Sequence, residues 1–130
     1  MKKKLSRIPD AELDIMLILW RNDRALRVSE IYTELQPVRP CSKAAVHTLI
    51  DRLSKRGFVH IEHVETTQPY KLITPLVQEE EYRITESETL VNKLCSGKWQ
   101  PLIASLCDCG KLSEADLNEI AELLNKGNKQ

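Results

Sequence analysis

The chain of 130 residues lacks any apolar run long enough to cross a membrane. A transmembrane helix needs roughly 20 apolar residues, whereas the longest apolar stretch here runs only from Ile15 to Trp20. The sequence therefore predicts no membrane insertion, and we expect the protein to be cytoplasmic. In that compartment its four cysteines are expected to be free thiols rather than disulfides.

Patterns typical of catalysis are absent as well. The sequence contains no Ser/His/Asp spacing, no glycine-rich phosphate loop and no His-x-x-x-His pattern, which are the arrangements that nucleophilic, phosphoryl-transfer and zinc chemistry use. Its Asp and Glu residues are spread along the solvated faces of predicted helices. We therefore expect a protein that is not an enzyme and that needs no cofactor.

Net charge is also absent, because 19 Lys and Arg residues balance 19 Asp and Glu residues. This balance hides an asymmetry between the two halves of the chain. Residues 1–73 hold 13 basic against 9 acidic residues, whereas residues 74–130 hold 6 against 10. Such halves predict a basic module that faces a polyanion such as nucleic acid and an acidic module with another task.

Glycine is scarce, and each of the four glycines lies near the end of a predicted helix: Gly57, Gly97, Gly110 and Gly127. Apolar residues at helical spacing predict helices over residues 10–21, 28–35, 42–56, 79–95, 99–107 and 113–126. The predicted apolar stripe of the first helix consists of Leu13, Met16, Leu17 and Trp20.

The third predicted helix is the most informative segment. Its apolar stripe consists of Val46, Leu49, Ile50 and Leu53, and Ser42 stands where an N-cap belongs. The opposite face is polar and mostly basic, with Lys43, His47, Thr48, Arg52, Lys55 and Arg56. This pattern is typical of a helix that packs on a domain and meets nucleic acid, and the alternative is a solvated basic surface helix.

After this helix the apolar period changes to two. Residues 59–62 and 70–73 alternate as strands do, and residues 65–69 form the predicted hairpin loop between them. Three helices followed by a hairpin is the order of a winged helix-turn-helix domain. The sequence thus predicts a mainly α fold with a small β-hairpin, made of a winged helix domain over residues 1–75 and a three-helix domain over residues 76–130.

The three helices after Pro75 are too short to bury their apolar stripes alone. We expect a homodimer joined through residues 76–127, because a two-fold protein can read a two-fold site. The alternative is that these helices pack on the winged domain of the same chain. The expected interface residues are Tyr82, Leu90, Val91, Leu94, Leu106, Leu117, Ile120 and Leu124.

Three segments resemble the BlaI/MecI/CopY family of bacterial repressors. They are Ile8-Pro9-Asp10-Ala11-Glu12-Leu13 with Leu19-Trp20, the helix from Val46 to Gly57, and Pro75-Leu76-Val77-Gln78-Glu79-Glu80-Glu81-Tyr82. The resemblance implies a dimeric repressor that binds a palindromic operator through the third helix and the wing and controls resistance or stress-response genes. It places on the DNA side the residues Ser42, Lys43, Ala44, His47, Thr48 and Arg52, with Lys71 as the wing cation.

Two modes of release follow from the same resemblance. In the penicillinase branch a membrane sensor metalloprotease triggers cleavage of the repressor, and the scissile bond would map to Ser105–Leu106. In the copper branch, copper displaces zinc at clustered cysteines, which makes a CopY-like metal- or thiol-responsive repressor using Cys107 and Cys109 the alternative. Two thiols are half of a closed zinc site, so the sequence assigns no metal and keeps these cysteines as weak candidates.

Overall fold

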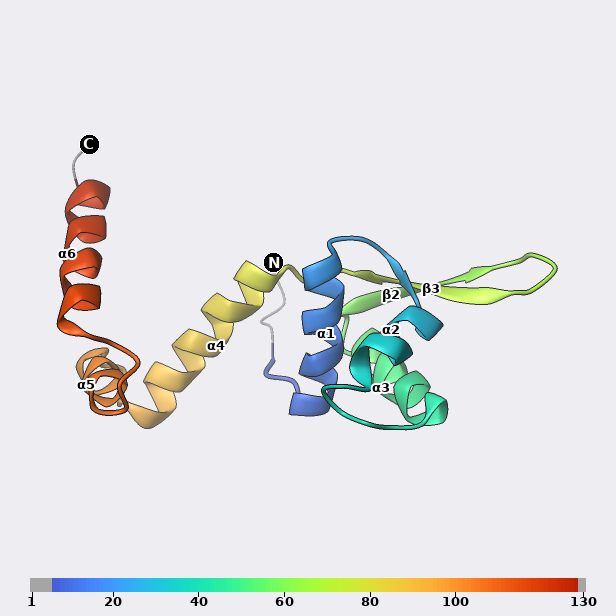
Figure 1. The fold of residues 1–130 in the computed structure, drawn as a ribbon, viewed down its shortest axis with the longest axis horizontal. Helices are drawn as coiled ribbons and strands as arrows, with labels where there is room; N and C mark the ends of the chain where they lie inside the picture. The colour runs from blue at the N-terminus through green and yellow to red at the C-terminus, as the bar shows by residue number, and fades with distance from the viewer. Residues whose placement is uncertain (1–5, 129–130) are drawn as a thin grey trace. The chain divides into compact units, whose positions relative to one another are not determined.

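The computed structural model describes residues 6–128, so the ends of the two predicted domains, residues 1–5 and 129–130, lie outside the described part. The chain divides into two compact units: unit 1 runs to Thr85 and unit 2 starts at Glu86. Figure 1 shows the order of the helices and strands. The architecture is mainly helical with one small antiparallel sheet, which confirms the predicted fold class.

Unit 1 contains three helices, α1 (Asp10–Asn22), α2 (Val28–Leu35) and α3 (Lys43–Lys55). Their bounds agree with the predicted helices to within a residue or so. The buried face of α1 is different from the predicted stripe, since Ile15 is fully buried whereas Leu17 is 43% exposed. The reason is that α1 packs against α2, α3 and the sheet together, so it buries a wider face than a helix with one neighbour.

The sheet has three strands in the order β1 (Leu26–Arg27), β3 (Tyr70–Pro75) and β2 (Val59–Val64), all antiparallel. The β2–β3 hairpin, here called the wing, projects past the helices in Figure 1. The sequence predicted the wing but missed β1. A two-residue strand that pairs Leu26 with Ile73 is too short to show any alternation.

The first turn of the helix that follows the sheet, α4 (Glu79–Leu94), belongs to the core of unit 1. The Tyr82 ring lies 5.9 Å from that of Trp20 and 5.6 Å from that of Phe58, and its hydroxyl accepts a hydrogen bond from the backbone N–H of Ile8 at 3.0 Å. Trp20 also donates its indole N–H to the carbonyl of Val77 at 2.8 Å. Unit 1 therefore continues beyond the predicted boundary at residues 75 and 76.

This packing corrects one predicted dimer contact. Tyr82 was expected in the interface between two chains, but its side chain is only 3% exposed within unit 1. An aromatic residue that follows a linker is compatible with either environment on the sequence alone. The buried ring leaves almost no surface for a partner chain, so Tyr82 fixes the start of its helix to the winged domain instead.

Unit 1 also contains a buried carboxylate. Glu12 on α1 is 1% exposed, and its Oε1 accepts a hydrogen bond from Nε of Arg56 at 2.9 Å. Burial of a lone charge is costly, whereas a paired and hydrogen-bonded carboxylate is tolerated. This ion pair joins α1 to the residue that follows α3.

Three helices follow the sheet, as predicted: α4 (Glu79–Leu94), α5 (Gln100–Asp108) and α6 (Glu114–Asn128). Only α4 begins in unit 1, and the other two lie wholly in unit 2. The N-terminus of α6 has the predicted acidic capping box, because Ser113 Oγ accepts from the N–H of Asp116 and the carboxylate of Asp116 accepts from the N–H of Ser113. These hydrogen bonds lower the pKa of Asp116.

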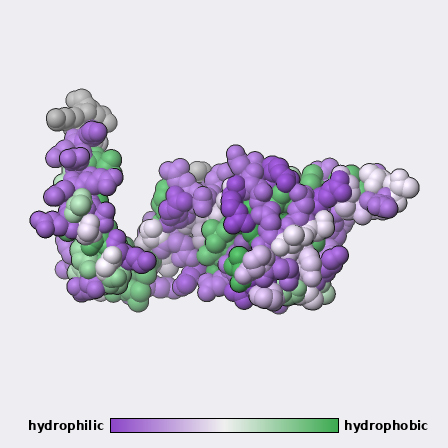
Figure 2. Space-filling model, in the orientation of Figure 1, coloured by the Kyte–Doolittle hydropathy of each residue, from purple (hydrophilic) through white to green (hydrophobic). Residues whose placement is uncertain are grey.

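Unit 2 leaves many apolar side chains in contact with solvent, and Figure 2 shows hydrophobic surface over its helices. The exposed large apolar residues of this unit are Leu90, Leu94, Trp99, Leu117, Leu123 and Leu124. Among residues 6–128, no helix has the length and apolar character that a bilayer crossing demands.

Candidate nucleic-acid interface

Helix α3 is well defined at both ends. At its start the Ser42 hydroxyl accepts a hydrogen bond from the N–H of Ala45 at 3.1 Å, as predicted for an N-cap. At its end Gly57 has a φ of +82°, and the N–H groups of Gly57 and Phe58 donate to the carbonyls of Ser54 and Leu53. This is a Schellman motif, which requires a left-handed residue and so favours glycine.

One face of α3 is anchored and the other is free. Val46, Ile50 and Leu53 are buried in the core, which fixes the rotation of the helix about its axis. The opposite face therefore points away from the domain. Of the predicted DNA-facing residues on and before this helix, His47 is half-buried and the others are exposed, namely Ser42, Lys43, Ala44, Thr48 and Arg52.

Thr48 is held by its own helix. Its hydroxyl donates a hydrogen bond to the carbonyl of Ala44 at 3.1 Å, which uses the hydroxyl hydrogen and leaves the oxygen of this exposed side chain able to accept. A threonine in this state can still accept a hydrogen bond from a base or contact a thymine methyl group.

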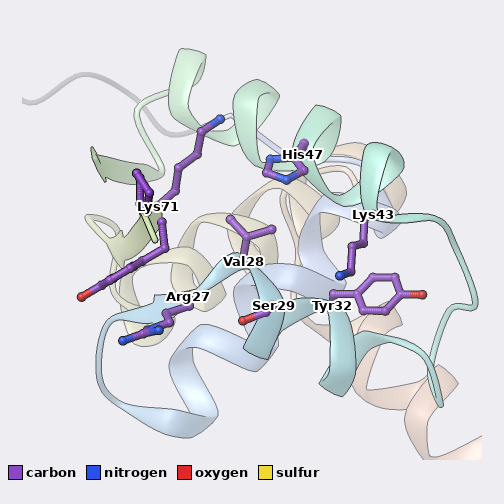
Figure 3. A pocket seen from close by; sticks show the side chains of 9 residues that line it. Arg27, Val28, Ser29, Tyr32, Lys43, His47 and Lys71 are labelled. Atoms are coloured by element: carbon purple, nitrogen blue, oxygen red, sulfur yellow. The ribbon is translucent and has the colours of Figure 1, made fainter. Parts of the chain in front are cut away.

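A shallow hollow of about 320 Å³ lies between α2, α3 and the wing. It brings together three of the predicted residues, Lys43, His47 and Lys71, although Lys71 belongs to β3. The other four predicted residues, Ser42, Ala44, Thr48 and Arg52, lie elsewhere on or before α3. Figure 3 shows side chains converging on the hollow from the three elements. The lining residues are Arg27, Val28, Ser29, Tyr32, Lys43, His47, Pro69, Tyr70 and Lys71.

Two contacts between cations and rings line this hollow. The guanidinium carbon of Arg27 lies 3.8 Å from the ring centroid of Tyr70, and the Lys43 ammonium lies 5.6 Å from that of Tyr32. Both are within the range of cation–π attraction. Sequence reasoning missed Arg27 and Tyr70, because neither lies on the basic helix. The alternation of residues along β3 predicts on which side of the strand Tyr70 lies. Nothing in the sequence indicates that Arg27 lies beside it.

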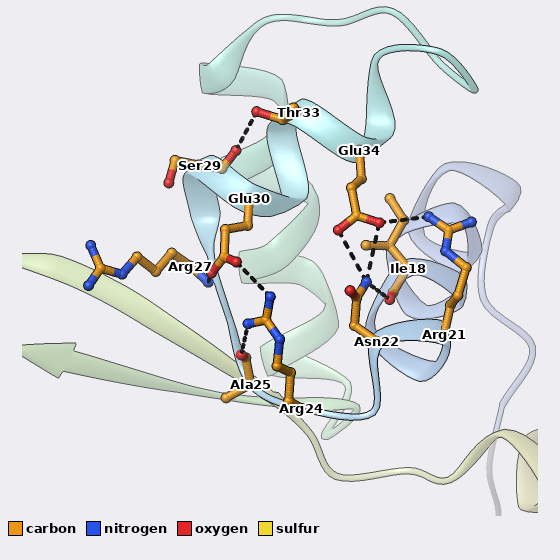
Figure 4. A network of polar contacts seen from close by, with 10 residues as sticks. All are labelled: Ile18, Arg21, Asn22, Arg24, Ala25, Arg27, Ser29, Glu30, Thr33 and Glu34. Atoms are coloured by element: carbon orange, nitrogen blue, oxygen red, sulfur yellow. Dashed lines mark hydrogen bonds and ion pairs between the residues drawn. The ribbon is translucent and has the colours of Figure 1, made fainter.

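A polar network joins α2 to α1 and to the segment that precedes α2, as Figure 4 shows. Arg24 binds the carboxylate of Glu30 at 2.8 Å, and the second oxygen of Glu30 accepts from the backbone N–H of Arg27 at 3.0 Å. The hydrogen bond from Arg24, followed by that from Arg27, lowers the pKa of Glu30. The hydrogen bond between Arg24 and Glu30 in turn raises the pKa of Arg24. Both groups are thus charged at neutral pH.

A second carboxylate joins α1 to α2. Glu34 accepts hydrogen bonds from Arg21 at 2.8 Å and from the amide of Asn22 at 3.1 and 3.2 Å. The bond from Arg21, followed by that from Asn22, lowers the pKa of Glu34. These surface pairs are individually weak, but together they fix the orientation of the helix that precedes α3.

The cysteine candidates show no closed metal site. Cys107 lies in α5 and Cys109 directly after it, and the thiol of Cys109 approaches the carbonyl of Leu106 at 3.5 Å. No group of three or more His, Cys, Asp and Glu side chains that could hold a metal ion occurs in the described part of the chain. Within residues 6–128, Cys107 and Cys109 thus supply two thiols, fewer than the roughly four ligands of a closed zinc site.

The candidate cleavage bond, Ser105–Leu106, lies inside α5. The carbonyl of Ser105 accepts a hydrogen bond from the N–H of Cys109, and that of Leu106 accepts from the N–H groups of Lys111 and Leu112. The bond is therefore part of a hydrogen-bonded helix end.

The remaining predicted interface residues lie on the helices of unit 2 or at the end of α4. Leu90 and Leu117 are about two-fifths exposed, and Leu94 and Leu124 are 76% and 64% exposed. Leucines with this much solvent contact are available to a partner. Val91, Leu106 and Ile120 are half-buried within the unit.

Comparisons of the sequence with known proteins identify its family. A family model described as penicillinase repressor matches residues 8–126. The chain is 25% identical to the penicillinase repressor of Bacillus licheniformis, covering 95% of this chain and 94% of that protein. It is 29% identical to the methicillin resistance regulatory protein MecI of Staphylococcus aureus, covering 97% and 99%.

Two solved structures of the repressor BlaI match about three fifths of the chain. The DNA-binding domain of the repressor BlaI is 29% identical, with a TM-score of 0.48, and covers 63% of this chain and 94% of that one. The monomeric form of Bacillus licheniformis BlaI in complex with the blaP half-operator is 28% identical, with a TM-score of 0.47, and covers 62% and 94%.

Proposed function

The chain belongs to the penicillinase repressor family, and from this membership we propose that it represses transcription as a homodimer on a two-fold operator. Members of the family are DNA-binding transcriptional repressors with a winged helix fold. The observation that carries the proposal is the exposed basic face of α3, whose opposite face is locked in the core. A helix held in this way can enter the major groove with its side chains in a fixed register.

Base choice is assigned to α3 and overall affinity to the wing. Thr48 and Arg52 are exposed on the polar face of α3 and His47 is half-buried there, and all three are assigned to base edges. Lys71 lies on β3 at the hollow, where a lysine neutralises a phosphate without reading sequence. Binding should therefore weaken steeply as salt rises, because each neutralised phosphate releases counterions.

The homodimer is assigned to the unit 2 side of the chain. Several leucines on α4 and α6 are exposed. Contact of so much apolar surface with water is unfavourable for a small helical unit that has no partner. An interface between two copies would cover them and present two copies of α3 to two half-sites. Paired binding of this kind can exceed the affinity of one half by a factor of roughly 100 or more.

The regulated genes and the signal are the finer parts of the proposal. The named relatives are a penicillinase repressor and a methicillin resistance regulatory protein. We therefore assign to this chain the regulation of resistance or stress-response genes, and we place the protein in the cytoplasm of its host. Separation of the two protomers is sufficient for release, since it removes the gain from paired half-sites. Cleavage at Ser105–Leu106 by a membrane sensor protease would require α5 to unwind first, because proteases bind extended chain.

The experiment that tests the proposal measures binding of the full chain to a labelled duplex from upstream of its own gene. Fluorescence anisotropy is recorded at several salt concentrations, with a duplex of unrelated sequence as the comparison. We expect tighter binding to the upstream duplex and a steep salt dependence of both. Equal affinity for the two duplexes would contradict a repressor of its own gene, and no affinity for either would contradict DNA binding.

Variants then separate base reading from phosphate binding. We expect Thr48→Ala and His47→Ala to change which base pairs of the operator matter, by about 1–3 kcal/mol at the affected positions. Lys71→Ala should weaken binding to all sequences alike. If base preferences survive both helix substitutions unchanged, the assignment of α3 as the reading helix is wrong.

A further inference from the structure

Arg27 lines the hollow between α2, α3 and the wing. It is the last residue of β1, immediately precedes α2 and is exposed. Its guanidinium carbon lies 3.8 Å from the ring centroid of Tyr70 on β3. The positive charge of Arg27 is therefore located beside the wing. Stacking uses the face of the guanidinium and leaves the N–H donors in its plane free for a ligand.

The neighbouring carboxylate does not neutralise this guanidinium by a direct ion pair. Glu30 gives one oxygen to Arg24 and the other to the backbone N–H of Arg27. Within residues 6–128, no salt bridge to the Arg27 side chain is present. The network of Figure 4 therefore occupies the nearby acid and leaves the Arg27 charge available.

The surroundings of Arg27 are cationic. Besides Arg27, the hollow contains the cationic side chains of Lys43 and Lys71, and none of its lining residues is acidic. Cations gathered on a shared surface repel one another unless an anion lies between them. The anion that an operator brings to the space between a recognition helix and a wing is a backbone phosphate.

We propose that Arg27, held on the ring of Tyr70, binds a backbone phosphate of the operator at this hollow. The assignment rests on the proposed DNA-binding function and adds an element to it, because the wing and α3 were the only DNA contacts expected. Arg27 contributes affinity and salt dependence but no base choice. Tyr70 is a positioning residue that acts through Arg27.

The test compares full-length wild type, Arg27→Ala, Tyr70→Leu and Tyr70→Phe on the upstream duplex at several salt concentrations. For Arg27→Ala we expect about a 5- to 10-fold loss of affinity at 0.1 M salt and a salt slope that is lower by roughly 0.9, the contribution of one phosphate. Tyr70→Leu should lose about 2- to 5-fold, the size of a cation–π contact, with the slope retained. Tyr70→Phe keeps the ring and should bind as wild type does.

Arg83→Ala is the matched control. Arg83 is an exposed arginine on α4 that pairs with Glu79, so this variant removes one positive charge from unit 1 outside the hollow. We expect its salt slope to equal that of wild type. Thermal unfolding of each variant verifies folding, and Arg27→Lys, which keeps the charge, should retain the slope.

The outcomes separate the two proposals. If wild type binds no duplex, the proposed function fails. If wild type binds and Arg27→Ala has the same affinity and slope, Arg27 contacts no phosphate and the inference is overturned. Equal losses for Tyr70→Leu and Tyr70→Phe would overturn the positioning role of the ring. A change of base preference in Arg27→Ala would replace the phosphate contact by a base contact.

Discussion

The two units of this chain bury their apolar side chains to very different extents. Unit 1 has a continuous core of Ile, Leu, Val and aromatic side chains that extends from Ile8 to Tyr82. In the described part of unit 2, Cys95 is the single buried apolar side chain, and several leucines are more than half exposed. Unit 1 thus has what it needs to fold by itself, whereas unit 2 has an apolar surface that a second copy can cover.

The comparison teaches where each kind of specificity resides. A continuous buried core fixes α3 and the wing, so that the side chains proposed to read DNA keep their register. In the proposed dimer, a surface that is buried only on association would make operator affinity depend on protein concentration and on any signal that separates the protomers. Substitutions in the two units should therefore fail in different ways.

The largest expected effect on stability is in the core of unit 1. Leu53→Ala removes a fully buried side chain from α3 and should lower the free energy of unfolding by about 2–5 kcal/mol, through lost transfer energy and a residual cavity. Leu123→Ala, at a position in α6 that is 63% exposed in the single chain, should change the unfolding free energy of the monomer by less than about 0.5 kcal/mol, so both variants are compared at a concentration where the chain is monomeric. Urea denaturation followed by tryptophan fluorescence measures both. Similar losses for the two variants would contradict the contrast between the units.

The next largest effect is expected on association. Leu124→Glu places a charge on the exposed apolar side of α6 and should convert the dimer to a monomer, with a roughly 100-fold loss of affinity for the full operator. Affinity for a half-site should stay unchanged. Sedimentation velocity and anisotropy measure the two quantities. Ala115→Glu, at an exposed position on the opposite side of the same helix, should remain a dimer, and dissociation of both variants alike would reject this surface as the interface.

Much of unit 1 could be predicted from the sequence because its local signals agree with its packing. The stripe of α3, the N-cap at Ser42 and the left-handed glycine at its end all define the same helix. The wing followed from a change of period. Where several neighbours compete for one helix, as at α1, a single periodic stripe was a poor guide, and Leu17 was wrongly placed in the core.

The site was only partly predictable, since residues that meet in space carry no shared signal in the chain. Lys43 and His47 follow from the helix period, and Lys71 from its place in the wing. Arg27 joins them only because the two-residue strand β1 pairs with β3 and brings it over the Tyr70 ring. Tyr82 was misplaced for a related reason, because its partners Ile8, Trp20 and Phe58 are all remote in sequence.

An intermediate effect is expected at the buried ion pair of unit 1. Arg56→Met leaves the Glu12 carboxylate, which is 1% exposed, without its cation and should cost about 2 kcal/mol. Glu12→Met leaves Arg56 with a side chain that is 38% exposed, so water can solvate the remaining charge and the cost should be smaller. Chemical denaturation of both variants and of the double variant gives the coupling energy. An equal cost for both single substitutions would contradict the view that the burial of the remaining charge determines the loss of stability.

The smallest expected effect is the acid dependence of the surface network that orients α2. Hydrogen bonds from Arg21 and Asn22 lower the pKa of Glu34, so its stabilising contribution is fully present above the ordinary glutamate value of about 4.3 and is lost as the pH falls through the lowered pKa. Glu34→Gln should therefore cost about 0.2–1 kcal/mol at pH 7, and the difference from wild type should shrink below about pH 4. Urea denaturation at pH 7 and at pH 3.5 measures it, with Glu65→Gln in the wing loop as the charge control. A difference that stays constant across this range would show that the Gln side chain disturbs packing rather than removes an ion pair.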